Sequence, residues 1–316
     1  MRLRPIRDEI LASHMHRSGW PFVMKSLEPL FDDSSSVIFD DFLEMTFSNR
    51  RKLLQDHVYE LPWMGVVHHP PDPPCWYHTE RLQVLEHARG WKTSIKNFRL
   101  CIALEENLAS WVRKNWNVPC VVARHPTEVP EMQWTPERFN LNASKMLLQV
   151  GWYLRNTYAI HQVNVDSRFT KAWLRQASAE ILENHRLCGV HAFPHRKHTG
   201  QVREISPVNN SEYDQLLSEN IVFIELFSAA ANNTIIECIA RNTPIVINRL
   251  AGPEYYLGPE YPLFYEDIED LNSFVTEDRV IAAHEYLKAM DKTWLSADSF
   301  REELRRACLE HFPEFV

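Results

Sequence analysis

Residues 228–258, SAAANNTIIECIARNTPIVINRLAGPEYYLG, decide how the fold is interpreted. This stretch begins with small and amide residues, continues into a short helical pattern and returns to an extended apolar run at 244–248. A further apolar run, IVFIEL at 221–226, precedes it. The order strand, helix, strand is typical of a parallel sheet, so we expect an α/β fold.

The start of this helix has a structural and a functional interpretation. Thr234 to Glu237 match a capping box, and Glu237 and Arg241 are spaced as a favourable i,i+4 pair. Alternatively, free backbone N–H groups around Asn232, Asn233 and Thr234 form an anion site that needs no glycine-rich loop. The residues alone leave both interpretations open.

The flanking sequence predicts two α/β halves. In the first half the expected elements are strands at 36–44, 62–74, 98–104 and 119–126 and helices at 18–31 and 106–116. In the second half they are strands at 145–151, 221–226 and 244–248 and helices at 167–185, 211–220, 278–291 and 296–312. Three prolines and the lack of a clean period between 126 and 144 indicate a linker. We therefore expect a first domain at 1–130, a linker at 131–144, a second domain at 145–284 and C-terminal helices at 285–316 that could pack back on the first domain.

Composition argues against several classes of protein. The 316 residues include 34 basic and 42 acidic side chains, and the net charge of −8 argues against nonspecific nucleic-acid binding as the main role. The chain has no G-x-G and no G-x-S-x-G, which disfavours a Rossmann dehydrogenase and a hydrolase. No apolar stretch approaches ~18 residues, so we expect no transmembrane segment, while a peripheral membrane contact stays open. The six scattered cysteines indicate reduced thiols and a cytoplasmic protein.

The C-terminal half carries a family resemblance. The strand VFIEL is followed by a small-residue loop, by IIECIARNTPIVIN and by GPEYYLG. This order resembles the donor half of GT-B glycosyltransferases, especially the group whose retaining members carry an E-x7-E signature before G-x-P-V-V. Glu237 matches the second signature Glu, which binds the donor ribose in that family. The first signature position falls on Ala229, which puts a retaining mechanism in doubt.

The resemblance implies two Rossmann-like domains facing across a cleft, with C-terminal helices. It also implies a nucleoside-diphosphate sugar as donor substrate, a glycan or other hydroxyl acceptor, and no cofactor or metal. The donor-binding residues that we predict are Gly151, Arg155, Asn156, Asn232, Asn233, Thr234 and Glu237. Arg155 suits bidentate phosphate binding, although a surface arginine is the alternative. Lys171 is a weaker second cation, because we expect it on a solvated helix face.

A proline-stiffened loop in the first half carries the candidate catalytic residues. His68, His69 and Asp72 follow an expected strand, and each could serve as the general base of an inverting transferase. The alternative is a rigid connector whose histidines bond to backbone. Acceptor binding is predicted for Arg17, Gly19, Trp20 and Asp41, and His125 and Asp40 are weaker candidates. Core packing is the favoured alternative for Trp20, and a solvated position is the alternative for Asp40 and Asp41.

Three histidines, His191, His195 and His198, have a spacing that resembles metal ligands. No nearby carboxylate or cysteine pair completes a site, so we predict no metal there.

The sequence therefore predicts a metal-independent glycosyltransferase that transfers a hexosyl or pentosyl group. The alternatives are a non-catalytic GT-B-like binding or scaffold module, for which Ala229 is the best support, and another sugar-nucleotide enzyme such as an epimerase.

Overall fold

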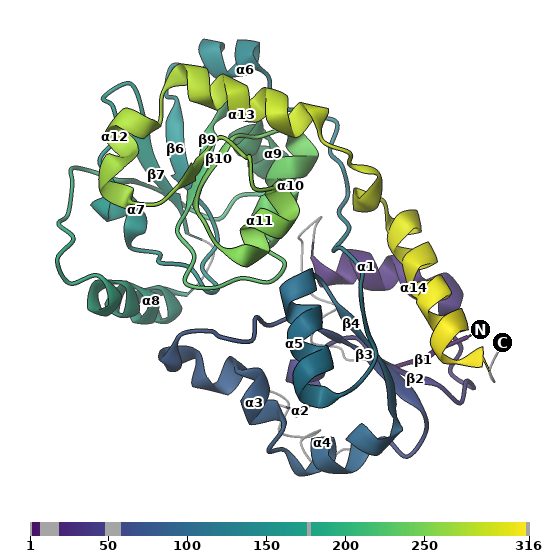
Figure 1. The fold of residues 1–316 in the computed structure, drawn as a ribbon. Coiled ribbons are helices and arrows are strands. Elements are labelled where there is room, and N and C mark those ends of the chain that lie inside the picture. The colour runs from purple at the N-terminus through teal and green to yellow at the C-terminus, as the bar shows by residue number, and fades with distance from the viewer. Residues whose placement is uncertain (1, 7–18, 48–57, 176–177, 314–316) are drawn as a thin grey trace. The chain divides into compact units, whose positions relative to one another are not determined.

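The computed structural model describes residues 2–6, 19–47, 58–175 and 178–313. The chain forms two compact units (Figure 1). Unit 1 comprises Met1–Glu128, Ala229–Ala231 and Thr293–Val316, and unit 2 comprises Val129–Ser228 and Asn232–Lys292. Each unit is built on a parallel sheet, as the alternation of strand and helix patterns predicts.

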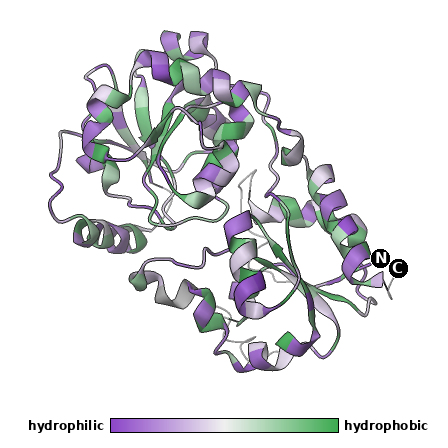
Figure 2. Cartoon of the chain, in the orientation of Figure 1, coloured by the Kyte–Doolittle hydropathy of each residue, from purple (hydrophilic) through white to green (hydrophobic). Residues whose placement is uncertain are grey.

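The sheet of unit 1 has the order β1-β2-β3-β4-β5, and its strand pairs are parallel. Its strands are β1 (Arg4–Pro5), β2 (Ile38–Asp40), β3 (Trp63–Val67), β4 (Phe98–Ala103) and β5 (Cys120–Val122). Trp63 and Val67 face one hydrophobic core, whereas Met64 and Val66 face the other. This period of two shows that both faces of the sheet are covered, and Figure 2 shows the strands as predominantly hydrophobic.

Helices from distant parts of the chain cover the two faces of this sheet. One core contains residues of α2 (Leu43–Phe47), α3 (Leu82–Leu85), α4 (Arg89–Ser94) and α5 (Glu106–Trp116). The other contains residues of α1 (Trp20–Leu27) and α14 (Ala297–His311). Helix α14 packs on α1 and β4, so a helix far along the chain covers part of one face of the sheet of unit 1.

The sheet of unit 2 has the order β11-β10-β9-β6-β7-β8, and its strand pairs are also parallel. The strands are β6 (Met146–Gln149), β7 (Thr170–Leu174), β8 (Arg203–Ile205), β9 (Ile221–Ile224), β10 (Ile245–Asn248) and β11 (Phe264–Tyr265). The helices are α6 (Pro136–Leu141), α7 (Ala159–Gln162), α8 (Ala179–Ala192), α9 (Asn210–Glu219), α10 (Asn233–Arg241), α11 (Ala251–Leu257), α12 (Leu271–Phe274) and α13 (Glu277–Ala289). The direction of winding reverses between β6 and β9. The carboxyl ends of strands at such a switch point are the usual ligand position in open α/β sheets.

The helix expected at 167–185 is wrong. This segment contains strand β7 and the start of α8, whose N-cap is Ser178. No glycine or proline separates the strand from the helix, so the two apolar patterns merge in the sequence. Lys171 consequently lies buried in β7 and not on a solvated helix face; its ammonium group donates to the carbonyls of Val163 and Thr199.

The segment at 131–144 contains α6 and belongs to unit 2. Trp134 is fully buried, and its Nε1–H donates to the carbonyl of Asn220 over 3.0 Å. A buried indole with its N–H satisfied anchors this stretch to the unit.

Among the described residues, no helix combines the length and apolar character that crossing a membrane requires.

Candidate functional site

The strand order of unit 2 reverses between β6 and β9, and the loops that follow these two strands meet there. These loops are joined by an isolated antiparallel bridge between Arg155 and Leu226. The N–H of Asn156 donates to the carbonyl of Glu225 over 2.9 Å, and the N–H of Phe227 donates to that of Leu154 over 2.9 Å. Backbone bonds therefore hold the two loops in a defined arrangement at the point where the sheet order reverses.

The guanidinium group of Arg155 lies at the N-terminus of α10. Its Nη2 donates to Oδ1 of Asn232 and to Oγ1 of Thr234, each over 3.0 Å. Gly151, with φ of 70°, lies against the same group, since a Cβ at Gly151 would be 1.3 Å from Nη1 of Arg155. A side chain at residue 151 would thus be strained and would displace the arginine. The structure brings together four of the predicted donor-binding residues.

The N-terminus of α10 is capped by Asn232 and not by the capping box expected at Thr234. The Oδ1 atom of Asn232 accepts from the N–H groups of Thr234 and Ile235. Asn233 is the first helical residue and its side chain is exposed. A positive arginine thus sits beside the positive end of a helix dipole among neutral amide and hydroxyl groups, and this arrangement favours an anion nearby.

Glu237 is buried on the face of α10 toward α9. Its side chain is 4% exposed, and its Oε2 accepts from the hydroxyl of Tyr213 over 2.6 Å. The expected i,i+4 partner, Arg241, pairs with Asp214 and donates to the backbone carbonyl of Glu237. Glu237 and Arg241 of α10 are therefore part of an internal polar network. Burial and the neighbouring Glu237 carboxylate raise the pKa of Tyr213 well above its ordinary value.

Asn156 is fully buried and bonds to Glu225, the residue that directly follows β9. Its Nδ2 donates to Oε2 of Glu225 over 2.6 Å. Glu225 also accepts from Arg196 over 2.7 and 2.8 Å, and the guanidinium group of Arg196 lies 3.7 Å from the ring centre of Phe193. Glu225 and Arg196 are not among the residues predicted from the sequence. An acidic residue directly after the apolar run at 221–224 was the available signal for Glu225.

The carboxyl end of the sheet in unit 1 carries a second polar cluster. Asp41 is buried and accepts from Nε1 of Trp20 over 3.0 Å. Asp40 accepts from the hydroxyls of Thr46 and Tyr59 over 3.0 and 2.9 Å. Trp20 also packs edge-on against Phe300. Trp20 belongs to a hydrophobic core, Asp41 is buried beside it, and Gly19 is the N-cap of α1, while their roles in acceptor binding stay predictions. Arg17 lies outside the described residues.

His68 is enclosed by aromatic rings at the end of β3. Its ring stacks on Phe42 at 4.0 Å and meets Trp20 edge-on at 4.3 Å. Nε2 lies 2.9 Å from the carbonyl of Asp41, which makes Nε2–H the donor in the neutral ring. Burial lowers the pKa of His68 to about 3, so the ring is neutral at physiological pH. Burial likewise lowers the pKa of His125 to about 4.

Glu44 in α2 holds the backbone of the His68–His69 turn. Its Oε1 accepts from the N–H of His68 over 2.8 Å and from that of His69 over 2.7 Å. The side chain of His69 is buried, whereas Asp72 is exposed in the following loop. No motif in the sequence indicated Glu44, because its role depends on residues more than twenty positions away.

The predicted absence of a metal at the histidine-rich segment remains a prediction. His191, His195 and His198 are exposed, and the ring of His198 lies 5.2 Å from that of His161. Within the described ranges, no group of three or more His, Cys, Asp or Glu side chains is arranged to hold a metal ion.

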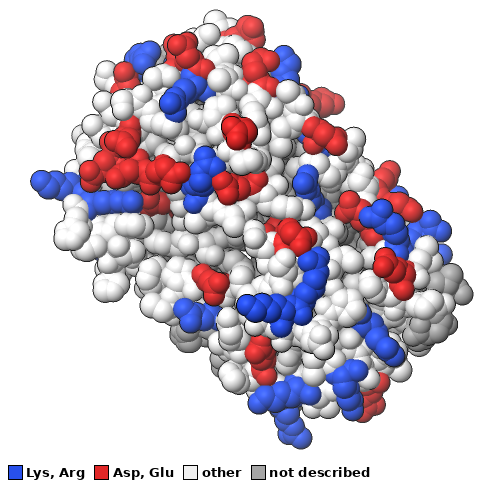
Figure 3. Space-filling model, viewed as in Figure 1, with Lys and Arg blue, Asp and Glu red and all other residues white. Residues whose placement is uncertain are grey.

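On the face drawn in Figure 3, acidic and basic side chains are interspersed.

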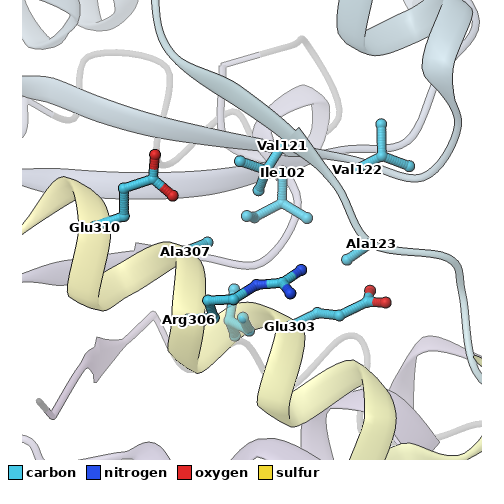
Figure 4. Close-up of a pocket in the computed structure, with 9 residues that line it drawn as sticks. Ile102, Val121, Val122, Ala123, Glu303, Arg306, Ala307 and Glu310 are labelled. Atoms are coloured by element: carbon cyan, nitrogen blue, oxygen red, sulfur yellow. The ribbon is translucent and has the colours of Figure 1, made fainter.

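A small cavity in unit 1 lies between α14 and the β4–β5 edge (Figure 4). Its volume is about 90 Å³, its floor includes Ile102 and Ala307, and Glu303, Arg306 and Glu310 extend from α14 around it. None of the predicted site residues is among its described lining residues.

Solved structures resemble this chain, although no family model and no curated protein matches its sequence. Sucrose-phosphate synthase from Thermosynechococcus elongatus aligns with a TM-score of 0.61 at 14% identity, covering 93% of this chain and 78% of that chain. HepE from Anabaena, in complex with UDP and glucose, aligns with a TM-score of 0.63 at 9% identity, covering 92% and 82%. The UDP-forming α,α-trehalose-phosphate synthase from Burkholderia vietnamiensis aligns with a TM-score of 0.53 at 11% identity, covering 87% and 74%.

These three proteins are GT-B glycosyltransferases, and the chain shares their fold. The α/β fold class that the sequence predicted is thereby confirmed. Identities this low establish a fold; activity has to be argued from the site.

Proposed function

We propose that this protein is a glycosyltransferase that transfers a sugar from a nucleoside-diphosphate sugar to a hydroxyl of a glycan or another acceptor. The observation that carries the proposal is the guanidinium group of Arg155 at the N-terminus of α10, next to the point where the strand order reverses between β6 and β9. HepE from Anabaena has the same fold and was solved with UDP and glucose. The fold of a protein solved with a nucleoside diphosphate and a helix N-terminus beside an arginine support the same assignment.

The chemistry requires stabilisation of a leaving diphosphate. Negative charge grows on the diphosphate as the bond to the sugar breaks, and a fixed cation and a helix dipole stabilise this charge without reorganising. Arg155 and α10 would supply both, so the proposal includes a metal-independent reaction without a resident cofactor. Glu237 would accept from the ribose hydroxyls; a carboxylate has enough lone pairs to keep its bond to Tyr213 at the same time.

The proposal is tested by thermal unfolding in the presence of UDP, GDP, TDP and CMP compounds. A ligand at about 100 times its dissociation constant is expected to stabilise the folded protein by about 2.7 kcal/mol. The sugar nucleotide with the largest effect is then offered with candidate acceptors, and transfer of a hexosyl or pentosyl group is measured. Absence of any stabilisation by all four nucleotide classes would remove the donor site from the proposal.

The phosphate role of Arg155 is tested separately. Arg155→Ala is expected to weaken nucleoside-diphosphate binding by about 10- to 100-fold, since a hydrogen bond to a charged group contributes about 1.5–3 kcal/mol. Binding of the nucleoside alone, measured by calorimetry, is expected to change much less. Arg155→Lys tests whether charge alone suffices. Arg186→Ala is the matched control, because the side chain of Arg186 on α8 is 41% exposed. An equal loss for nucleoside and nucleoside diphosphate would exclude the phosphate role.

A non-catalytic binding module is a second candidate, favoured by one observation. Residue 229, where the resembling family has its first signature Glu, is alanine and cannot contact a sugar hydroxyl through a carboxylate. Stabilisation by a nucleotide without transfer to any of a broad set of acceptors would support this candidate over the transferase.

A further inference from the structure

Glu44 contacts the candidate catalytic turn in an unusual way. One carboxylate oxygen, Oε1, accepts two consecutive backbone N–H groups, those of His68 and His69, over 2.8 and 2.7 Å. These two residues directly follow β3, which ends at Val67. Two bonds to one oxygen fix the position and the direction of the peptide unit between the two histidines.

The side chain of Glu44 is removed from solvent. The side chain is 3% exposed, and its other oxygen, Oε2, has no hydrogen-bond partner in the part of the chain that the structure describes. Burying half of a carboxylate without a partner is costly when the group is ionised. Such a residue is not needed for packing, because an apolar side chain would fill the space without this cost.

We propose that Glu44 is a positioning residue that sets the conformation of the His68–His69 turn through its two hydrogen bonds. The inference rests on the proposed function only in so far as the turn carries the general base. The bonds themselves are independent of any activity.

The carboxyl group of Glu44 also couples the turn to pH. Burial raises the pKa of Glu44 to about 8, and the two N–H donors only partly offset this effect. The group is therefore largely neutral below about pH 7 and becomes ionised as the pH rises through about 8. An ionised acceptor forms stronger hydrogen bonds, so the turn is held more firmly above this pH.

Several other titratable groups lie around Glu44. They are Asp40 at the end of β2, Cys101 on β4, and His68 and His69 of the turn, with His125 facing His68 from the segment after β5. His68 and His125 have lowered pKa values of about 3 and about 4, so neither changes charge near pH 8. Burial raises the pKa of Cys101 well above its ordinary value.

The test follows the backbone amide signals of His68 and His69 in the full chain labelled with 15N-histidine. In the unmodified protein, both signals are expected to shift together with a midpoint near pH 8. Glu44→Gln keeps an oxygen acceptor but cannot ionise, so the shift should be lost. Glu105→Gln is the matched control, because Glu105 is equally buried and, as the N-cap of α5, accepts two backbone N–H groups, those of Asn107 and Leu108. The control should leave the shift in place.

Two results would overturn the inference: a shift that persists in Glu44→Gln, or no common shift in the unmodified protein between about pH 3.5 and 9.5, a range that includes the ordinary glutamate pKa. Thermal unfolding gives an independent measurement. The pKa of Glu44 is raised from 4.5 to about 8 in the folded state. The stability contributed by its bound proton is therefore lost as the pH rises from 4.5 to about 8. Glu44→Gln should lack this decline, and an unchanged decline would also count against the inference.

Activity distinguishes this inference from the proposed function. If the protein is a transferase, Glu44→Ala is expected to lower kcat by about 10- to 100-fold through misplacement of the turn, with Glu44→Gln restoring part of it. If no transfer is found but the amide signals behave as expected, the proposed function fails and the positioning role of Glu44 stands.

Discussion

Replacing Asp214 by alanine is expected to lower the free energy of unfolding of unit 2 by about 3–5 kcal/mol. Asp214 on α9 pairs with Arg241 on α10, and the two side chains are 6% and 1% exposed. Removing one partner leaves an uncompensated charge in the interior, which costs more than the pair itself contributes. Urea denaturation followed by circular dichroism measures the change.

Two controls test whether the loss of stability comes from the burial of this ion pair or would follow from the loss of any ion pair. Glu183→Ala removes the partner of Arg186 in an exposed pair, with side chains 55% and 41% exposed, and should cost about 0–1 kcal/mol. Replacing both Asp214 and Arg241 by apolar residues should cost less than Asp214→Ala alone, because no charge remains unpaired. A loss below about 1 kcal/mol for Asp214→Ala would show that water reaches this pair in solution.

Removing the general base of the proposed transferase is expected to lower kcat by about 10²–10⁴-fold while leaving donor affinity nearly unchanged. The candidates are His68, His69 and Asp72, each tested as a single alanine variant by initial rates and by calorimetry with the nucleoside diphosphate. Each variant is first checked for folding, since His68 packs between Phe42 and Trp20. Full activity in all three variants would exclude this turn as the source of the base.

The pH profile identifies His68 if it is the base. A base must be unprotonated to accept the acceptor proton, and the pKa of His68 is lowered to about 3. Apart from the change near pH 8 that ionisation of Glu44 would cause, the rate should then fall only as the pH decreases through about 3. A limb near the ordinary histidine pKa of about 6.5 would exclude His68 and point to another group.

Local signals in the sequence were enough for most elements. The helix expected at 106–116 is α5 (Glu106–Trp116), because an apolar period of 3.6 residues is bounded by the Glu105 cap and by Asn117, whose φ is 52°. The strand expected at 98–104 is β4, since the apolar run has no competing period. The segment at 167–185 failed because β7 and α8 adjoin without a turn residue that marks the boundary.

Polar partners were much harder to predict than elements. Arg155 was predicted as a phosphate ligand, but its bonds to Asn232 and Thr234 span 77 and 79 residues of sequence. The same holds for Asp214 and Arg241, and for Glu44 and the His68–His69 turn. No periodicity encodes such pairs, because they form only when the strand order brings two loops or helices together.

The sequence by itself determined the class of fold and most of the strands and helices of the two sheets. Apolar spacing is a local property, and burial of apolar surface is the main driving force that converts it into structure. Only the tertiary structure decided which polar groups are sealed inside and what they contact. A buried charge is stable only beside a partner, and the place of that partner is set by the order of the strands, which residue patterns along one segment do not contain.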